Sequence, residues 1–598
     1  MSKQVKREIR ASTVASAAGV GAVIDVGAES FVVPGIDYWR QASLRAVTLL
    51  RLSSRLNRNL KTTSDVKPWL KVRRFPRAMF CEGCRKITIW KSEMEKQGEE
   101  PSCPHRGCGG ALVPMRFVVA CENGHLDDFD WGRWAHSGPD ASPGCRSREK
   151  LTFTVDDKAG TGGLASLVVG CEVCSSSRSL EEITARDANR HLLGKCSCRH
   201  PWLFGAQGTC DAEPEVLQRG ATNLHYPVTI SALDIPDDVV LEPTEEFAEQ
   251  IMAHKRYDKL KNLVSDTEGN NREFLETVAE MIAEQVGCKI GTVLDVVKAD
   301  VAGTPVSVES TTQTELDQNV LLNEEWKTIR YALGEGGIRG QNFRARPEAL
   351  DDNAPLWAKR LLNGVILVER LREVRAYRGF QRVNPGGPER TVPPDVGGAE
   401  TWLPCTEVFG EGIALSFDLD RLKAWSETIP EKELHDLQQL EQKRLDENFW
   451  FLPKVDPVFM ALHALSHLLL RRITFECGYS SSSLRERLYF DPEQGSAGIM
   501  IYTADADSEG SLGGLVRQGQ KDRLAQTLYE AAEQGRWCSA DPVCSETAGQ
   551  GLGGFNRASC HACLLVAETS CTCANTVLDR RLLLDENWGL LTFLEQNA

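Results

Sequence analysis

Most of the twenty cysteines in this chain of 598 residues stand in short clusters that have the spacing of zinc ligands. A C-x2-C pair places two thiolates on one tight turn, which suits a tetrahedral Zn²⁺ ion, and a second pair closes the site. The first cluster contains two close pairs, Cys81 with Cys84 and Cys103 with Cys108. These residues predict a zinc-ribbon-like module that holds one structural ion.

The second cluster offers five cysteines for four ligand positions. Cys171 and Cys174 form its C-x2-C pair, and we expect Cys196 and Cys210 to complete the site. Cys198 is an alternative to Cys196, because a single residue separates the two. A third cluster lies near the C-terminus and contains Cys538, Cys544, Cys560, Cys563, Cys571 and Cys573.

A further set of residues of ligand type lies between the first two clusters. It consists of Cys121, His125, His136 and Cys145. These four side chains have the composition of a tetrahedral zinc site, although their spacing has no familiar form. The alternative is a buried free thiol beside two hydrogen-bonding histidines. The sequence therefore predicts three zinc ions, or four if this set binds metal.

A disulfide framework is the competing interpretation of the cysteines, and it suits short secreted chains. The N-terminal residues carry charge and lack an apolar stretch with a cleavage site, so we expect no signal peptide. We also expect no transmembrane helix, because no run approaches eighteen apolar residues. These features favour a cytoplasmic protein, where reduced thiols bind metal.

Positive charge is concentrated at the start of an acidic protein. The formal net charge is −15, yet residues 1–80 contain fifteen Lys and Arg against five Asp and Glu. Such a region can contact the phosphates of DNA, or else it is a solvated face or a contact with an acidic partner. The candidate DNA-binding residues are Arg58, Lys71, Arg73, Arg74 and Arg77, with Arg375 and Arg378 as weaker candidates.

Motifs of an autonomous enzyme are missing from the sequence. It contains no phosphate-binding G-x-x-x-x-G-K-[ST] loop. His463 and His467 have the spacing of a zinc protease helix, but Ala464 stands where the catalytic glutamate belongs, which favours two buried, hydrogen-bonded histidines. The acidic residues between Asp505 and Glu509 resemble the start of a calcium loop that is not completed. We therefore expect no catalytic site, and a cryptic metal-dependent nuclease is the alternative.

The elements that position these residues indicate a mixed α+β multi-domain protein. We expect a basic N-terminal segment at 1–75, with a helical pattern over 36–59, and a zinc-ribbon-like region at 76–230. A helical middle region with a Pro/Gly loop is expected at 231–400, and an α/β zinc-binding domain at 401–598. An apolar helix from Pro457 to Ile473 is expected in the last domain.

Beyond spacing, the C-terminal segment resembles a known module. The run CHACLLVAETSC, from Cys560 to Cys571, resembles the MrfA-like zinc-binding domain found at the C-terminus of some superfamily 2 DNA helicases. The runs EVFGEGIALSFD (407–418) and GYSSSSLRERLY (478–489) agree with it. In that module four cysteines hold one zinc, which implies Cys544, Cys560, Cys563 and Cys571 as ligands here. Cys538 competes with Cys544 for one position, and Cys573 competes with Cys571.

The N-terminal half carries a second and more specific resemblance. The runs IRASTVASAAGVGAVIDV (9–26), CENGHLDDFDW (121–131) and LQRGATNLHYPVTISALDIP (217–236) are similar to DrmB-like proteins of the bacterial antiphage system DISARM. This resemblance implies a zinc-binding subunit of a defence complex that partners a DrmA-like helicase and helps engage foreign DNA. A purely structural scaffold without DNA contact is the alternative.

Overall fold

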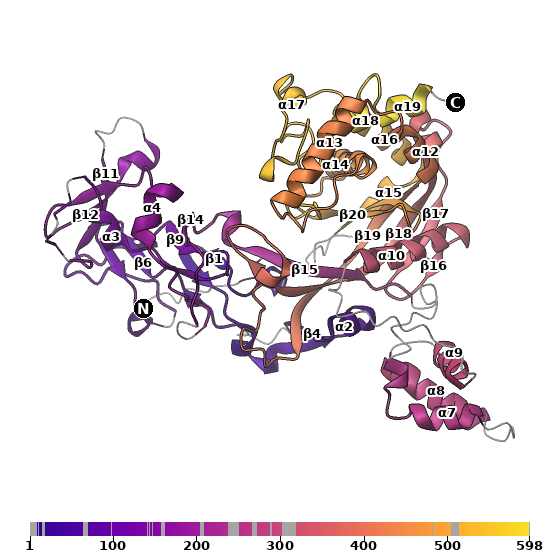
Figure 1. The fold of residues 1–598 in the computed structure, drawn as a ribbon, viewed down its shortest axis with the longest axis horizontal. Coiled ribbons are helices and arrows are strands. Elements are labelled where there is room, and N and C mark those ends of the chain that lie inside the picture. The colour runs from indigo at the N-terminus through magenta and orange to yellow at the C-terminus, as the bar shows by residue number, and fades with distance from the viewer. Residues whose placement is uncertain are drawn as a thin grey trace.

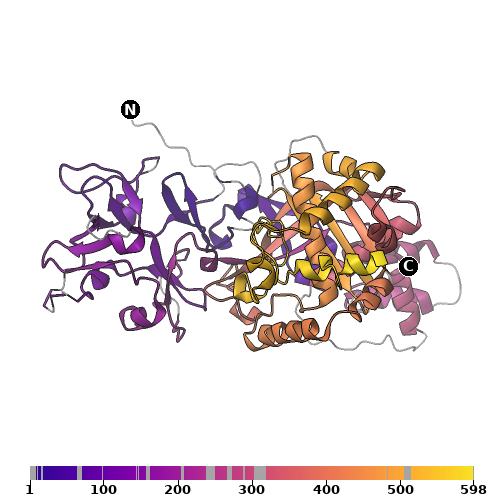
Figure 2. The same ribbon diagram turned by 90° about the horizontal axis from the view of Figure 1, so that it is seen from above.

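The computed structural model of the protein shows an N-terminal lobe and a larger C-terminal lobe joined by long strands (Figures 1 and 2). It describes residues 9–596 apart from 10, 15–17, 64–69, 97, 140, 143, 146, 157–161, 204–207, 237–249, 266–271, 287–289, 302–317, 481 and 504–512. The acidic run at Asp505–Glu509 lies outside the described residues. The mixed α+β class expected from the sequence is confirmed.

Two long antiparallel strands connect the lobes: β18 (Leu362–Gln381) and β19 (Trp402–Phe417). One half of this pair lies in the C-terminal lobe, where β17 (Arg344–Glu348) pairs with β18 and β21 (Ser496–Thr503) pairs with β19. At the other half, β15 (Tyr226–Leu233) pairs with β18 and β4 pairs with β19. Segments far apart in sequence therefore share one sheet.

Among the described residues, this sheet has nine strands. Its main path runs β16-β17-β18-β19-β21-β20, β15 joins β18, and the pair β3-β4 joins β19. The remaining members are β16 (Ile338–Arg339), β20 (Leu484–Asp491), β3 (Leu44–Val47) and β4 (Asn59–Thr63). The predicted boundary at 400/401 falls in the loop between β18 and β19, and the four-segment division stays a prediction. The Pro/Gly loop folds back on β18 through paired backbone hydrogen bonds between Val392 and Phe380.

Helices cover both faces of this sheet in the C-terminal lobe. Alternate strand residues point to opposite sides, so Ile366 and Met500 pack toward α10 (Gln318–Gly334) while Val365 and Ile499 join the core beneath α14. The sheet is thus the middle of three layers (Figure 1). The helices of this lobe are α11 (Leu356–Leu361), α12 (Leu419–Ser426), α13 (Glu431–Asp446), α14 (Pro457–Cys477), α15 (Gly514–Gln518), α16 (Lys521–Gly535), α17 (Val543–Glu546), α18 (Arg580–Leu584) and α19 (Leu590–Gln596).

Helix α14 lies at the centre of the helical layer that covers the Val365 face of the sheet. Residues in the sequence of α14 mark both of its ends. The Asp456 carboxylate accepts hydrogen bonds from the backbone N–H groups of Val458 and Phe459, and Gly478 ends the helix at φ 68°. By length and mean hydropathy α14 is the one helix in the described part of the chain that is able to span a membrane, but 72% of its apolar window is buried. Such burial is typical of a helix that packs in the core of a protein.

Where the structure describes it, the N-terminal lobe contains four small three-stranded sheets. Their strands are β1 (Val23–Val26), β2 (Glu29–Val32) and β5 (Arg73–Arg74); β6 (Ala78–Cys81), β7 (Ile87–Ile89) and β8 (Leu112–Pro114); β9 (Phe117–Ala120), β10 (Leu126–Asp128) and β14 (Glu215–Gln218); and β11 (Leu151–Val155), β12 (Leu167–Cys171) and β13 (Ser177–Ser179). The helices there are α1 (Ala11–Val14), α3 (Trp131–Ala135) and α4 (Arg186–Leu193). Buried apolar residues such as Phe117, Trp131 and Trp134 pack between these short strands.

The sequence predicted helices in two further segments, and the structure agrees with these predictions to different degrees. The helices expected after residue 241 exist as α7 (Tyr257–Ser265), α8 (Arg272–Val286) and α9 (Ile290–Val301), which enclose a core of their own. The helical pattern expected over 36–59 is confirmed only in part. That segment forms two short 3-10 turns, strand β3 and helix α2 (Leu50–Leu56) before β4 begins. Pairing of β3 with β4, which itself joins the large sheet, overrides the helical pattern.

Candidate metal centres

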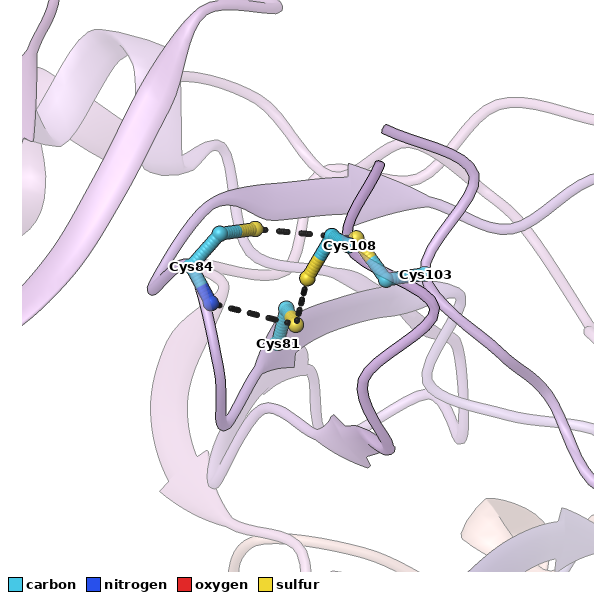
Figure 3. Close-up of side chains that lie close together, drawn as sticks. All are labelled: Cys81, Cys84, Cys103 and Cys108. Atoms are coloured by element: carbon cyan, nitrogen blue, oxygen red, sulfur yellow. Dashed lines mark hydrogen bonds between the residues drawn. The ribbon is translucent and has the colours of Figure 1, made fainter. Parts of the chain in front are cut away.

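The four cysteines of the zinc-ribbon-like module meet at one point (Figure 3). Cys81 lies at the end of β6, Cys84 follows on the adjoining turn, and Cys103 and Cys108 lie on the segment that leads into β8. The Sγ atoms of Cys81 and Cys108 are 3.5 Å apart, and those of Cys84 and Cys103 are 3.6 Å apart. Because β8 pairs with β6, the sheet brings the two halves of the site together.

These separations are those of ligands around one ion. A tetrahedral zinc with Zn–S bonds of about 2.3 Å places its sulfurs about 3.8 Å apart. A disulfide would bring two sulfurs to about 2.05 Å. Across the four cysteine-rich groups among the described residues, the contacts between sulfur atoms run from 3.5 to 4.0 Å. The donor sets therefore fit Zn²⁺, as the cysteine spacing predicted.

The second group joins residues that the sequence analysis assigned to different sets. It consists of Cys121, His125, Cys196 and Cys210, whose ligand atoms lie within 4.8 Å of one another. Cys121 Sγ is 3.3 Å from His125 Nδ1, 3.6 Å from Cys196 Sγ and 3.9 Å from Cys210 Sγ. The competing Cys198 stays outside the group, although it is buried, because its Sγ–H donates toward the carbonyl of Cys196.

The third group consists of His136, Cys145, Cys171 and Cys174. Gly132 fixes the imidazole of His136, because its carbonyl oxygen lies 2.7 Å from Nδ1 and can only accept the N–H there. Nε2 is thereby directed to the Sγ of Cys174, 3.3 Å away. Orientation of a ligating histidine by a backbone carbonyl is typical of metal sites.

These two groups correct the expected partition of ligands. Cys171 and Cys174 do not share a site with Cys196 and Cys210, and the set Cys121, His125, His136 and Cys145 is divided between two sites. The physical reason is strand pairing. Cys121 follows β9, and the backbone N–H of Leu126 in the neighbouring β10 donates to Arg199, which holds the loop that carries Cys196 at that edge. Cys171 ends β12, which pairs with β11 and β13 in a different sheet.

The fourth group lies in the C-terminal lobe and contains Cys538, Cys544, Cys560 and Cys563. Cys538 Sγ is 3.5 Å from Cys560 Sγ, and Cys544 Sγ is 3.8 Å from Cys563 Sγ. Both residues that competed for one position are therefore present, and the expected ligand Cys571 is not. Its sulfur lies instead beside His463, with which it makes a contact of 3.3 Å.

Each of the four groups includes a thiol whose pKa is lowered. Burial opposes the charge on Cys81 and on Cys560, but backbone N–H groups and neighbouring thiols outweigh it and lower the pKa of each to about 7. The hydroxyl and the N–H of Ser176 lower the pKa of Cys174 to about 6. A hydrogen bond from another thiol of its group lowers the pKa of Cys121. Thiolates are the form in which cysteine binds zinc.

Several of the predicted DNA-binding residues have partners within the protein. The side chain of Arg74 is 5% exposed and forms ion pairs with Glu29 and Glu95, at 2.9 and 2.8 Å. Arg73 donates to the backbone carbonyl of Leu203 at 2.9 Å. Arg375 is buried against a glutamate. Partners within the protein thus engage Arg73, Arg74 and Arg375, and Arg77 is a fourth candidate with such a partner.

The other candidate residues differ in how far their side chains are exposed and free to contact DNA. Arg77 is half exposed and is paired with Asp128 at 2.8 Å. Arg58 and Lys71 are exposed, and Arg378 is half-buried. Among the described members of the basic stretch, Arg58 and Lys71 are the candidates best placed to contact a polyanion.

Loss of zinc from paired variants tests the corrected grouping. Changing Cys174 and Cys196 to serine together removes a ligand from each of two sites. We expect this double variant to lose two equivalents of zinc, measured by elemental analysis of freshly reduced protein. Changing Cys171 and Cys174 together, within one site, should cost a single equivalent. Equal losses from the two double variants would restore the grouping expected from sequence.

Comparison with known proteins agrees with this geometry. Residues 465–564 match the family model of the MrfA Zn-binding domain, a span that contains the whole fourth group. Residues 10–226 match a family described as a domain of unknown function (DUF8724). The chain is also 30% identical over 500 residues to the DISARM protein DrmB of Bacillus paralicheniformis, and the match covers 81% of this chain and 82% of that protein.

Proposed function

This chain belongs to the DrmB family, and from that membership we propose that it is a non-catalytic, zinc-stabilised subunit of a bacterial antiphage defence complex. The observation that carries the proposal is the length of the match, which spans 81% of the chain and reaches both lobes. A similarity confined to one zinc module would suggest only a shared module. Similarity across both lobes and the sheet between them supports a shared role.

The closed form of the zinc groups supports a non-catalytic role. A catalytic zinc keeps one position for water or substrate, whereas a structural zinc has four protein ligands. Each of the four cysteine-rich groups supplies four ligands, of which three or four are cysteines. We propose that these ions hold short strands and loops in place and take no part in turnover.

We propose that the partner is a DrmA-like superfamily 2 helicase and that the complex works in the cytoplasm. All nineteen cysteines in the described part of the chain are free thiols, which supports a reducing compartment. Co-purification of the chain with a DrmA-like helicase from the same host tests the partnership. A cell that carries the complete system should lose phage resistance when this subunit is deleted. A subunit that neither co-purifies with the helicase nor affects resistance would contradict the proposal.

The ion pairs within the protein restrict which basic residues are available for the proposed contact with DNA. Arg51 and Arg55 form ion pairs with Glu324, and Arg74 is held by Glu29, so much of the positive charge near the N-terminus is neutralised inside the protein. This observation favours the alternative of a scaffold without DNA contact. Exposed Arg58 and Lys71 are the residues through which the proposed contact is tested.

The salt dependence of DNA binding distinguishes the two functions. Each Lys or Arg that meets a phosphate contributes roughly 0.7 to 0.9 to the slope of log affinity against log salt. If both Arg58 and Lys71 contact DNA, changing them to alanine should lower the slope of the helicase complex by about 1.4 to 1.8. Fluorescence anisotropy with a labelled duplex and a labelled single strand measures the slope.

A matched variant controls for the loss of charge alone. Lys432 is exposed on α13 in the other lobe, and Lys432→Ala should leave the slope unchanged. An unchanged slope in the variant at Arg58 and Lys71, with the helicase still bound, would move the scaffold function ahead.

A further inference from the structure

We infer that the C-terminal lobe holds a fifth zinc ion in a buried site made by His463, His467, Glu486 and Cys571. The ligand atoms of these residues lie within 4.8 Å of one another. All three of the non-cysteine side chains are fully buried, and Cys571 is 8% exposed. The site is separate from the four cysteines of the neighbouring group and does not depend on the proposed partner or on DNA.

Both histidines are held in the orientation that a metal requires. The carbonyl oxygen of Val577 lies 3.3 Å from Nδ1 of His463, and that of Leu564 lies 3.0 Å from Nδ1 of His467. A carbonyl only accepts, so both Nδ1 atoms carry the proton, and the Nε2 atoms of neutral rings present lone pairs. The i, i+4 spacing on α14 places these two lone pairs on one face of the helix. Backbone carbonyls orient ligating histidines in the same way in known zinc sites.

The Nε2 atoms meet other acceptors and too few donors. Glu486 Oε1 lies 3.1 Å from Nε2 of His463 and 3.5 Å from Nε2 of His467. A proton on His463 would satisfy the carboxylate, yet Nε2 of His467 makes no hydrogen bond although it is buried. Leaving a buried polar nitrogen unsatisfied is costly, and native structures rarely tolerate it. A cation at the centre of the group would bind both lone pairs and the carboxylate together.

Surrounding donors stabilise the anionic forms of the other two ligands. The Sγ of Cys571 accepts the backbone N–H groups of Cys573 and Asn575, each at 3.3 Å. Glu486 Oε1 accepts the N–H of Thr572 at 3.2 Å, and the Ser466 hydroxyl donates to Oε2. Hydrogen bonds of this kind hold a thiolate and a carboxylate in place for a metal.

The chemistry of the donor set favours zinc. Two imidazoles, one thiolate and one carboxylate combine nitrogen, sulfur and oxygen, which a tetrahedral Zn²⁺ accepts together. The site is closed, because protein fills all four positions and the residues are buried. A closed site implies a structural ion that joins α14, β20 and the C-terminal segment. The match to the MrfA Zn-binding domain ends at 564 and begins at 465, so His463 and Cys571 lie outside it.

Zinc stoichiometry of the intact chain tests the site. We expect five equivalents in the wild-type protein purified under reducing conditions without chelator, by elemental analysis and native mass spectrometry. His467→Ala and Cys571→Ser should each remove one equivalent and leave four. Cys573→Ser is the matched control, because that neighbouring thiol is not among the four ligands, and it should retain five.

Cobalt substitution gives a second readout that does not depend on counting. The thiolate-to-cobalt absorption of the fully loaded protein should fall by about one thiolate in Cys571→Ser and be unchanged in Cys573→Ser. Four equivalents of zinc in the wild-type protein, with the same number in His467→Ala, would overturn the site. A fifth equivalent of iron in place of zinc would overturn the choice of metal. If the variants fail to fold, the wild-type count of five or four still decides.

Discussion

Cys563→Ser is expected to unfold the helical layer of the C-terminal lobe. Cys563 is 5% exposed, and its sulfur lies 3.8 Å from those of Cys544 and Cys560. Structural zinc contributes on the order of 10–16 kcal/mol to the folding of a small module. A whole domain is stable by only about 5–15 kcal/mol. Loss of one zinc ligand therefore removes a stabilising free energy comparable with the entire stability of the lobe.

The position of this group in the core is the reason to expect that unfolding extends beyond the zinc site. Cys538, Cys544 and Cys563 belong to the same buried cluster as Leu468 of α14 and Leu582 of α18. The zinc module is thus part of the main core, and its collapse exposes apolar surface of both helices. We expect little soluble protein, loss of zinc, and rapid cleavage within the last 140 residues in limited proteolysis.

A buried cysteine outside the groups provides the control. Cys405 lies on β19 with no exposed surface and belongs to none of the metal groups in the described residues. Cys405→Ser should keep the full zinc content and the proteolysis pattern of the wild-type protein. Soluble Cys563→Ser protein with unchanged zinc would contradict the assignment of the fourth group.

The second large effect is expected from Glu325→Ala, on the other face of the sheet. Glu325 has no exposed surface, and its carboxylate accepts hydrogen bonds from Arg487 at 2.6 and 2.9 Å. It also accepts from Arg51 at 3.1 Å and from the backbone N–H of Leu233 at 2.9 Å. This one side chain therefore ties α10 to β20, α2 and β15.

Removal of the carboxylate leaves a cation buried without its main partner. Arg487 is 3% exposed and would keep a single longer ion pair, 3.3 Å to Glu373, besides its hydrogen bonds to Ser231 at 3.0 and 3.1 Å. Breaking a buried ion pair in this way costs about 3–5 kcal/mol. We expect a fall of that size in the free energy of unfolding, measured by pulse proteolysis in urea with the zinc content unchanged.

The adjacent glutamate is a matched comparison for this variant. The side chain of Glu324 is 15% exposed and pairs with Arg51 and Arg55 nearer the surface. Glu324→Ala should cost less than Glu325→Ala, because the side chain of Glu324 is partly exposed and Arg51 keeps its contact with Glu325 at 3.1 Å. If the two variants were equally stable, the buried network around Arg487 would not be the feature that joins these elements.

Local spacing alone determined several features of this protein. The pairs at Cys81 and Cys103 specified the zinc-ribbon-like group, because their sulfurs lie on turns whose geometry the sequence sets. Asp456 and Gly478 mark the two ends of α14 for the same reason. The resemblance to the DrmB family was also carried by the sequence and is confirmed by the match to a known member.

Tertiary structure decided which distant residues meet. Cys171 and Cys174 share a turn, but whether their partners are Cys196 and Cys210 or His136 and Cys145 depends on which strands pair. The spacing of ligands within a turn is a local property, and the register of a sheet is not. The sequence analysis also missed Glu486, which stands between two arginines in β20 and has no local signal of a metal ligand.

The basic residues illustrate the same limit for charge. A count of Lys and Arg over residues 1–80 indicates a possible anion-binding face, but it does not show which of them have internal partners. Arg51 and Arg55 meet Glu324 and Glu325 from more than 260 residues away, because the large sheet brings α2 against α10. Attraction between opposite charges acts through space, so only the folded arrangement decides which positive charges remain available to a ligand.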